Sequence, residues 1–193
     1  MVIGITGGVG CGKSTVMNIL KEQYSAKLLV ADELGHQVME PGQEAYEKIC
    51  RAFGNDLVKE DGQINRNMLA DRIYADDSGR EKLNQIIHPC VKEVIHRKLE
   101  EWREEPLICL ETAILFETGC NELCDRIWCV MTEREIRIQR LMESRGYSRE
   151  KAESIMRVQL SEEEWMRRCD ACIENNGDLQ KLYERLQELL VTS

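Results

Sequence analysis

The feature that most constrains the fold is a glycine-rich segment near the start of the chain. Residues 7–14 read Gly-Gly-Val-Gly-Cys-Gly-Lys-Ser and match the phosphate-binding loop pattern G-x-x-x-x-G-K-[S/T]. The residues before it, 2–6, are strand-like, and residues 14–22 after it have helical spacing. A strand, a glycine loop and a helix in this order predict an α/β fold whose loop binds phosphate. An accidental Lys-Ser after a glycine-rich turn is the weaker interpretation.

The residue types in this loop point to a nucleoside triphosphate with Mg²⁺. Glycines let the backbone wrap so that its N–H groups point inward, and the following helix directs its positive end at the same place. Lys13 adds a cation for the outer phosphates, and the hydroxyl of Ser14 is expected to bind Mg²⁺. The expected nucleotide-binding residues of this segment are Gly8, Val9, Gly10, Cys11, Gly12, Lys13, Ser14, Thr15 and Val16.

Further apolar runs predict the rest of a five-stranded parallel sheet. They are short and almost free of polar residues, as strands buried on both faces are, and lie at 2–6, 28–31, 107–110, 127–131 and 171–173. Helical spacing alternates with them, most clearly at 179–190. Alternating strands and helices indicate one α/β domain over residues 1–193.

Two intervals without strands are expected to be helical. Residues 33–104 have helical periodicity at 45–53 and 90–99, with His88-Pro89 expected to interrupt it, and are predicted to form a helical insertion. Residues 133–160 are helical and rich in arginine: seven basic residues lie between 134 and 157 against four acidic ones. We expect this second interval to act as a lid.

Composition excludes several functional classes. The 35 acidic residues outnumber 26 basic ones for a net charge of −9, which argues against a nucleic-acid partner. The longest hydrophobic run, 127–131, is far shorter than the roughly 20 residues of a membrane span. Only six residues precede the glycine loop, which leaves no room for a secretory signal, so we expect a cytoplasmic protein. The nine cysteines are expected to be reduced thiols; a zinc site from Cys120, Cys124, Cys169 and Cys172 is a minor alternative.

Several charged residues are candidates for catalysis. Asp32 follows the strand-like run 28–31, where ligands of parallel sheets gather, and can orient an alcohol and accept its proton; it can also be a helix N-cap. Arg140 and Arg145 can close over the transferred phosphoryl group, or belong to a solvated helix face. Glu111 can hold a magnesium-bound water, or be a plain charge at a strand end. His88 can contact a substrate, although a structural role is the more common one for a single histidine.

Taken in order, these segments resemble the dephospho-coenzyme A kinase family over nearly the whole chain. The resemblance is carried by I-G-I-T-G-G-V-G-C-G-K-S-T at 3–15, A-D-E-L-G-H-Q-V at 31–38, I-I-H-P at 86–89, A-I-L-F-E at 113–117, the arginine pattern from 139 to 159, and I-E-N-N-G at 173–177. The chain departs from the family at Val30, Ala113 and Cys11, where the family often has Asp, Pro and Ser. The Val30 departure puts in doubt any role shared between two carboxylates.

The resemblance implies a P-loop kinase that transfers the γ-phosphate of ATP, with Mg²⁺, to the ribose 3′-hydroxyl of dephospho-coenzyme A. It implies that Asp32 is the base, that 33–104 binds the acceptor and that 133–160 is the lid. Asn175 and Asn176 lie where similar kinases hold adenine, and Thr6 is expected with His88 at the acceptor. We expect a monomer or small homo-oligomer.

Two alternatives stay open on the sequence alone. Another P-loop nucleotide or small-metabolite kinase has the same loop and lid and differs only in its acceptor pocket. A GTP-binding switch protein would carry the signature N-K-x-D, and the closest stretch, 175–178, lacks the lysine.

Overall fold

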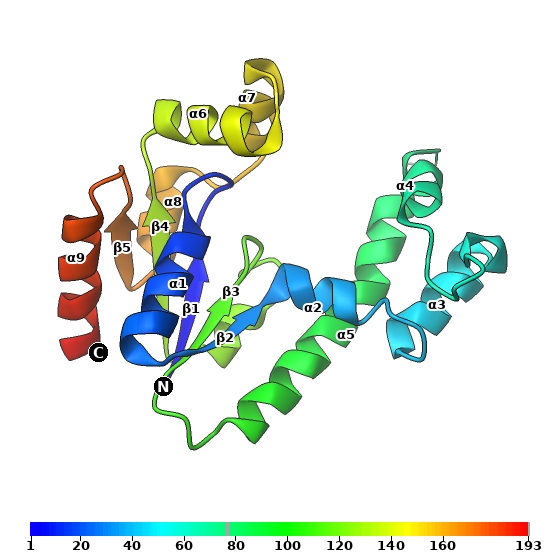
Figure 1. The fold of residues 1–193 in the computed structure, drawn as a ribbon, viewed down its shortest axis with the longest axis horizontal. Helices are drawn as coiled ribbons and strands as arrows, with labels where there is room; N and C mark the ends of the chain where they lie inside the picture. The colour runs from blue at the N-terminus through cyan, green and yellow to red at the C-terminus, as the bar shows by residue number, and fades with distance from the viewer. Residues whose placement is uncertain (76–77, 193) are drawn as a thin grey trace. The chain divides into compact units, whose positions relative to one another are not determined.

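The computed structural model describes residues 1–75 and 78–192. The chain forms two compact units, one made of Met1–Leu29 with Glu104–Ser193 and the other of Val30–Arg103. The first unit contains the sheet and the glycine loop, and the second is built from helices (Figure 1).

The sheet has five strands in the order β2-β3-β1-β4-β5, with β1 in the centre and β5 at one border. Their bounds are β1 (Val2–Thr6), β2 (Lys27–Val30), β3 (Ile108–Glu111), β4 (Arg126–Met131) and β5 (Ala171–Glu174). Strand β1 pairs in parallel with β3 and β4, and β4 pairs in parallel with β5. These strands confirm the predicted α/β class, and each lies within one residue of its expected bounds.

The central strands are continuous apolar runs because both faces of the sheet are covered. Ile3, Ile5 and Cys109 are completely buried, as expected for parallel strands between helix layers. In the view of Figure 1, α1 (Lys13–Tyr24) lies in front of the sheet and α8 (Glu162–Arg168) behind it. Gly4 lets the segment after β3 approach the sheet closely, because a Cβ there would lie 2.9 Å from the Sγ atom of Cys124 and 3.1 Å from the Cδ2 atom of Leu115.

Four more helical elements complete the first unit. They are η2 (Cys120–Leu123), α6 (Arg134–Arg145) and α7 (Arg149–Arg157) in the interval expected to be a lid, and α9 (Leu179–Val191) beside β5. Helix α9 uses its expected leucine spacing to bury Leu182, Leu186 and Leu189.

The helical unit contains α2 (Ala31–Gln37), α3 (Glu44–Phe53), η1 (Asn55–Leu57), α4 (Arg66–Ala75) and α5 (Gly79–Glu101). Its core consists of Ile49, Leu57, Ile64 and Leu69. Among its described residues the β-structure is a single isolated antiparallel bridge between Val58 and Ile64, which closes a turn that contains Gly62.

The expected interruption at His88-Pro89 is wrong. Helix α5 runs for 23 residues through both positions. A proline inside a helix costs about 3 kcal/mol or more, because it lacks an N–H and its ring crowds the preceding turn. The turns after Pro89 bury Val91, Val94 and Ile95, at about 1.5–3 kcal/mol for a fully buried aliphatic side chain. Burial therefore outweighs the local preference for a break.

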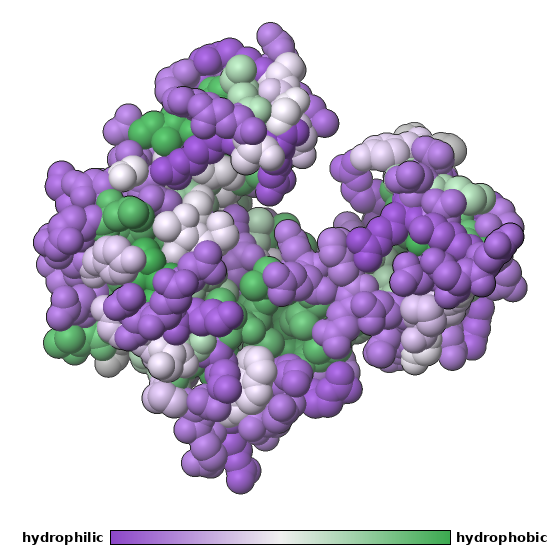
Figure 2. Space-filling view, in the orientation of Figure 1, coloured by the Kyte–Doolittle hydropathy of each residue, from purple (hydrophilic) through white to green (hydrophobic). Residues whose placement is uncertain are grey.

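The visible surface of each unit is mostly hydrophilic (Figure 2), in agreement with the charged composition. Among the described residues, no helix combines the length and the apolar character needed to cross a membrane.

Candidate functional site

The glycine loop has the backbone that its sequence predicts. Gly7, Gly10 and Gly12 adopt φ values of 138°, 77° and 84°, a region that side chains disfavour. Helix α1 begins immediately afterwards at Lys13. The Nζ atom of Lys13 lies 3.1 Å from the carbonyl oxygen of Gly7 and 3.4 Å from that of Gly8, so the ammonium group spans the loop.

The loop is also packed too tightly for larger residues. A Cβ at Gly7 would lie 2.4 Å from the carbonyl oxygen of Val130, and a Cβ at Gly12 would lie 2.1 Å from Nδ2 of Asn175. The backbone of β4 and the side chain of Asn175 therefore occupy the space beside these glycines. Glycine is required at both positions for contact as well as for φ.

The expected magnesium residues lie close to the loop. Glu111 ends β3 and forms an ion pair with Lys13 at 3.6 Å, with both side chains largely buried. Ser14 is exposed in the first turn of α1. A hydroxyl and a carboxylate are the hard oxygen ligands that Mg²⁺ prefers, so these residues fit the ion.

The interval 133–160, expected to act as a lid, belongs to the same unit as the loop and contacts it directly. The Nε atom of Arg137 donates to the carbonyl oxygen of Val9 at 3.0 Å, and its Nη2 atom donates to Oε1 of Gln159 at 2.9 Å. The same Oε1 atom accepts from the backbone N–H of Val9 at 3.0 Å. Arg137 and Gln159 thus clamp one residue of the loop, and Val9 packs against the lid core around Ile138 and Leu141.

Arg137 is not among the functional residues predicted from the sequence, where it is one of the seven basic residues between 134 and 157. The helical spacing does indicate its position. Arg140 and Leu141 lie three and four positions after Arg137, so the three residues share one helix face. The burial of Leu141 shows that this face points inward.

Arg140 is held against the carboxyl ends of β4 and β5. Its Nη2 atom donates to the carbonyl oxygen of Asn175 at 3.0 Å, and its Nη1 atom lies 3.5 Å from both Cys11 O and Thr132 Oγ1. Arg145 lies at the exposed end of α6. The expected phosphate roles of both arginines stay predictions.

The two asparagines expected at adenine differ in environment. Asn175 is 4% exposed, and its Nδ2 atom donates to the carbonyl oxygen of Cys11 at 3.0 Å. Asn176 is exposed, and its Oδ1 atom accepts from the backbone N–H of Glu133 at 2.9 Å.

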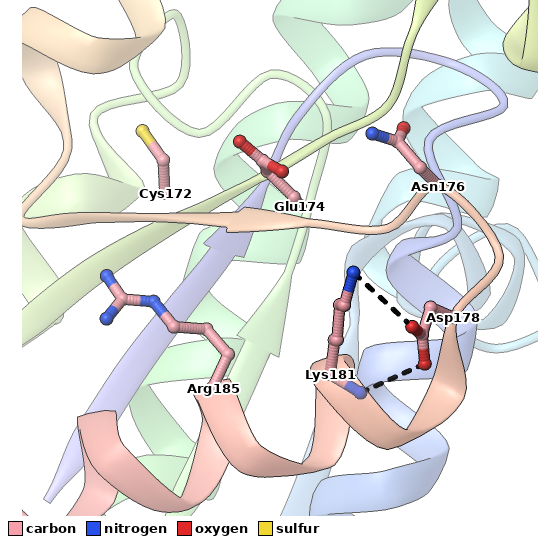
Figure 3. Close-up of a pocket in the computed structure, with 6 residues that line it drawn as sticks. All are labelled: Cys172, Glu174, Asn176, Asp178, Lys181 and Arg185. Atoms are coloured by element: carbon pink, nitrogen blue, oxygen red, sulfur yellow. Dashed lines mark hydrogen bonds and ion pairs between the residues drawn. The ribbon is translucent and has the colours of Figure 1, made fainter.

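A groove of about 450 Å³ opens between β5 and α9. Figure 3 shows Asn176 at one end of it, with Lys181 forming an ion pair to Asp178 and Arg185 extending from α9 toward the strand. Its remaining lining residues are Cys172 and Glu174. The groove therefore contains charges of both signs and none of the glycine-loop residues.

Asp32 lies in the helical unit, in the first turn of α2, and is exposed. The N-cap of α2 is Val30, so the interpretation of Asp32 as the N-cap is wrong. The strand ends earlier than expected, because the chain enters α2 at Ala31.

The two further acceptor candidates are more buried than Asp32. Thr6 is completely buried at the end of β1, and its hydroxyl has no hydrogen-bond partner among the described residues. His88 lies partly buried within α5, and burial lowers its pKa.

All nine cysteines are free. Cys129 and Cys172 are directly paired across β4 and β5, with their Sγ atoms 2.9 Å apart. Burial raises the pKa of Cys109 to about 12, and burial is also the main cause that raises the pKa of Cys11. Within residues 1–75 and 78–192, no group of three or more His, Cys, Asp or Glu side chains could hold a metal ion. The zinc alternative therefore has no support from the described residues.

Comparison with known proteins places this geometry in a family context. The family model for dephospho-CoA kinase matches residues 1–181. The dephospho-CoA kinase of Geobacter sulfurreducens is 36% identical over 190 residues, which cover 97% of this chain and 96% of that protein. The dephospho-CoA kinase of Fusobacterium nucleatum is 35% identical over 192 residues, which cover 100% of this chain and 98% of that protein.

Solved structures agree. The crystal structure of TT1252 from Thermus thermophilus has a TM-score of 0.83 at 32% identity and matches 100% of this chain and 97% of its own. Shikimate kinase from Bacteroides thetaiotaomicron has a TM-score of 0.56 at 13% identity, over 98% of each chain, and shares the fold alone. These findings fit neither the GTP switch nor a different P-loop kinase.

Proposed function

The chain belongs to the dephospho-CoA kinase family, and on that premise we propose that it transfers the γ-phosphate of ATP to the ribose 3′-hydroxyl of dephospho-coenzyme A. The observation that carries this proposal is the glycine loop, which has three glycines at positive φ, an inward ammonium group from Lys13 and the start of α1 in one short segment. The products are coenzyme A and ADP.

Residues of the first unit bind and neutralise the polyphosphate in this proposal. Loop amides and Lys13 bind the phosphate oxygens, and Arg140 and Arg145 offset charge that develops on the transferred group. Ser14 and Glu111 would hold Mg²⁺, which supplies positive charge to the phosphates when bound. Asn176 is proposed to contact the adenine.

Residues of the insertion 33–104, together with Asp32 and Thr6 outside it, receive the acceptor in this proposal. Asp32 orients the 3′-hydroxyl and accepts its proton late in the transfer, because the transition state of phosphoryl transfer is loose. Thr6 and His88 are proposed to contact the acceptor. A cytoplasmic location and a monomer or small homo-oligomer complete the proposal.

An acceptor panel tests the function. We expect the purified protein to release ADP from ATP and Mg²⁺ with dephospho-coenzyme A, and not with shikimate or nucleoside monophosphates. NMR of the product should place the new phosphate on the 3′ oxygen. Phosphorylation of another alcohol in the panel, with dephospho-coenzyme A inert, would contradict the proposal.

The substitution Asp32→Asn tests the base. We expect kcat to fall by on the order of 10²-fold or more, because an orienting and proton-accepting group is lost, while the Kd for ATP stays nearly unchanged. Glu33→Gln is the matched control, since Glu33 is the exposed neighbour in the same helical turn. Equal kcat values for the two variants would remove Asp32 from catalysis.

A further inference from the structure

One backbone carbonyl of the glycine loop is held by side chains from the ends of two other strands. The carbonyl oxygen of Cys11 accepts from Thr132 Oγ1 at 2.9 Å and from Asn175 Nδ2 at 3.0 Å. Arg140 Nη1, at 3.5 Å, is at the limit of a hydrogen bond. Thr132 follows β4, Asn175 follows β5, and both are at least 95% buried. Two buried donors therefore converge on one oxygen of the loop.

The hydroxyl of Thr132 has two carbonyl acceptors. A hydroxyl carries one proton, and Thr132 Oγ1 lies 2.9 Å from two acceptors, the carbonyl oxygens of Cys11 and Asn175. The Asn175 oxygen already accepts from Arg140 Nη2 at 3.0 Å. A carbonyl oxygen has two lone pairs, so Thr132 can donate to either oxygen, while the Nδ2 atom of Asn175 donates to Cys11 in both cases.

Fixing this carbonyl also fixes the next amide. The described residues contain no cis peptide, and in a planar trans peptide the C=O and the following N–H point in opposite directions. The oxygen of Cys11 points toward Thr132 and Asn175, so the N–H of Gly12 points away from them. Gly12 directly precedes α1, where loop amides bind phosphate.

We propose that Thr132 and Asn175 are positioning residues that aim the Gly12 amide at a phosphate of the bound nucleotide. This inference rests on the proposed function, since the phosphate is that of ATP. It gives Asn175 a role toward the polyphosphate in place of the adenine role expected from sequence. Asn175 also packs directly against Gly12, because a Cβ added to Gly12 would lie 2.1 Å from Nδ2 of Asn175. This close packing fits the same role.

Nucleotide titrations without acceptor test the proposal. In Thr132→Val and Asn175→Leu, each similar in shape to the native residue, the carbonyl of Cys11 loses a donor. With one of its two donors lost, this carbonyl, and with it the Gly12 amide, is held less firmly, and we expect the Kd for ATP to rise about tenfold. We expect the same factor for inorganic triphosphate, measured by competition with a fluorescent ATP analogue, because this probe has no base.

The controls separate positioning from general damage. Thr132→Ser keeps the hydroxyl and should stay within about twofold of the native Kd. Thr192→Val removes a similar hydroxyl-to-carbonyl bond, to Glu188 at 3.0 Å on α9, and should leave the Kd unchanged. Circular dichroism at the assay temperature identifies folded variants, and Asn175→Leu decides the matter if Thr132→Val is unfolded.

Two results would overturn the proposal. One is an affinity for inorganic triphosphate that is unchanged in the folded variants. If only the affinity for ATP fell, Asn175 would instead have the adenine role expected from sequence. The other is a Thr132→Ser variant as weak as Thr132→Val. The titrations contain no acceptor. The binding results can therefore be interpreted even if the dephospho-coenzyme A assay shows no activity.

Discussion

The clamp on Val9 makes Arg137→Met an informative substitution. Methionine keeps much of the length and packing of the side chain but removes the donors to Val9 O and Gln159 Oε1. Hydrogen bonds from a charged group contribute about 1.5–3 kcal/mol each. Burial lowers the pKa of Arg137, which shows that desolvating its charge opposes this gain. We therefore expect a net loss of about 2 kcal/mol in the free energy of unfolding. At this chain length that corresponds to a fall in Tm of about 4–8 °C.

Thermal unfolding followed by circular dichroism measures this loss, with Arg134→Met as the matched control. Arg134 lies on the same helix but is 56% exposed, and its ion pairs with Glu135 and Glu153 are at the surface. Exposed pairs contribute about 0–1 kcal/mol, so the control should lower Tm by at most about 4 °C. Equal shifts for the two variants would refute the assignment of Arg137 as the residue that joins lid and loop.

Two further predictions concern the loop and the helical unit. Gly12→Ala should weaken ATP binding about tenfold or more in titrations, because it combines a φ of 84° with a contact to Asn175; Gly42→Ala, with a φ of 85° and open space, should bind ATP normally. For His88, burial holds the folded pKa below its ordinary value of 6.5, so the unfolded chain binds a proton first and stability falls as pH drops from about 6.5 through the folded pKa. Tm measured between about pH 5 and 7 should therefore fall less steeply in His88→Asn than in the native protein, and identical slopes would contradict the role of burial.

The sheet and the loop were predictable because local sequence determines them. The central strands are short apolar runs buried on both faces, and the loop follows from glycines at fixed spacing before Lys13. Local preference misled at Pro89, where the buried face of α5 outweighs the proline. It also placed Asp32 at a strand end when the chain had already entered α2.

The contacts around the loop were not predictable, because they join residues distant in sequence. Cys11 lies 121 residues from Thr132 and 164 from Asn175, and Val9 lies 128 residues from Arg137. The spacing of the motifs predicts which segments come together around the glycine loop. It does not predict which side-chain atom forms a hydrogen bond with which backbone group. That choice depends on the parallel register of β4 with β5, which becomes known only once the sheet is formed.

The border of the sheet at β5 has a consequence for behaviour at high concentration. An outer strand presents unpaired backbone groups on which another molecule can add a strand, and such additions lead to aggregates. Here the outer strand has four residues and ends in Glu174, and charged side chains of α9 lie beside it (Figure 3). Because β5 is short and flanked by charged side chains, it can form few backbone hydrogen bonds with a strand from another molecule. We expect this edge to resist intermolecular sheet growth without a covering element.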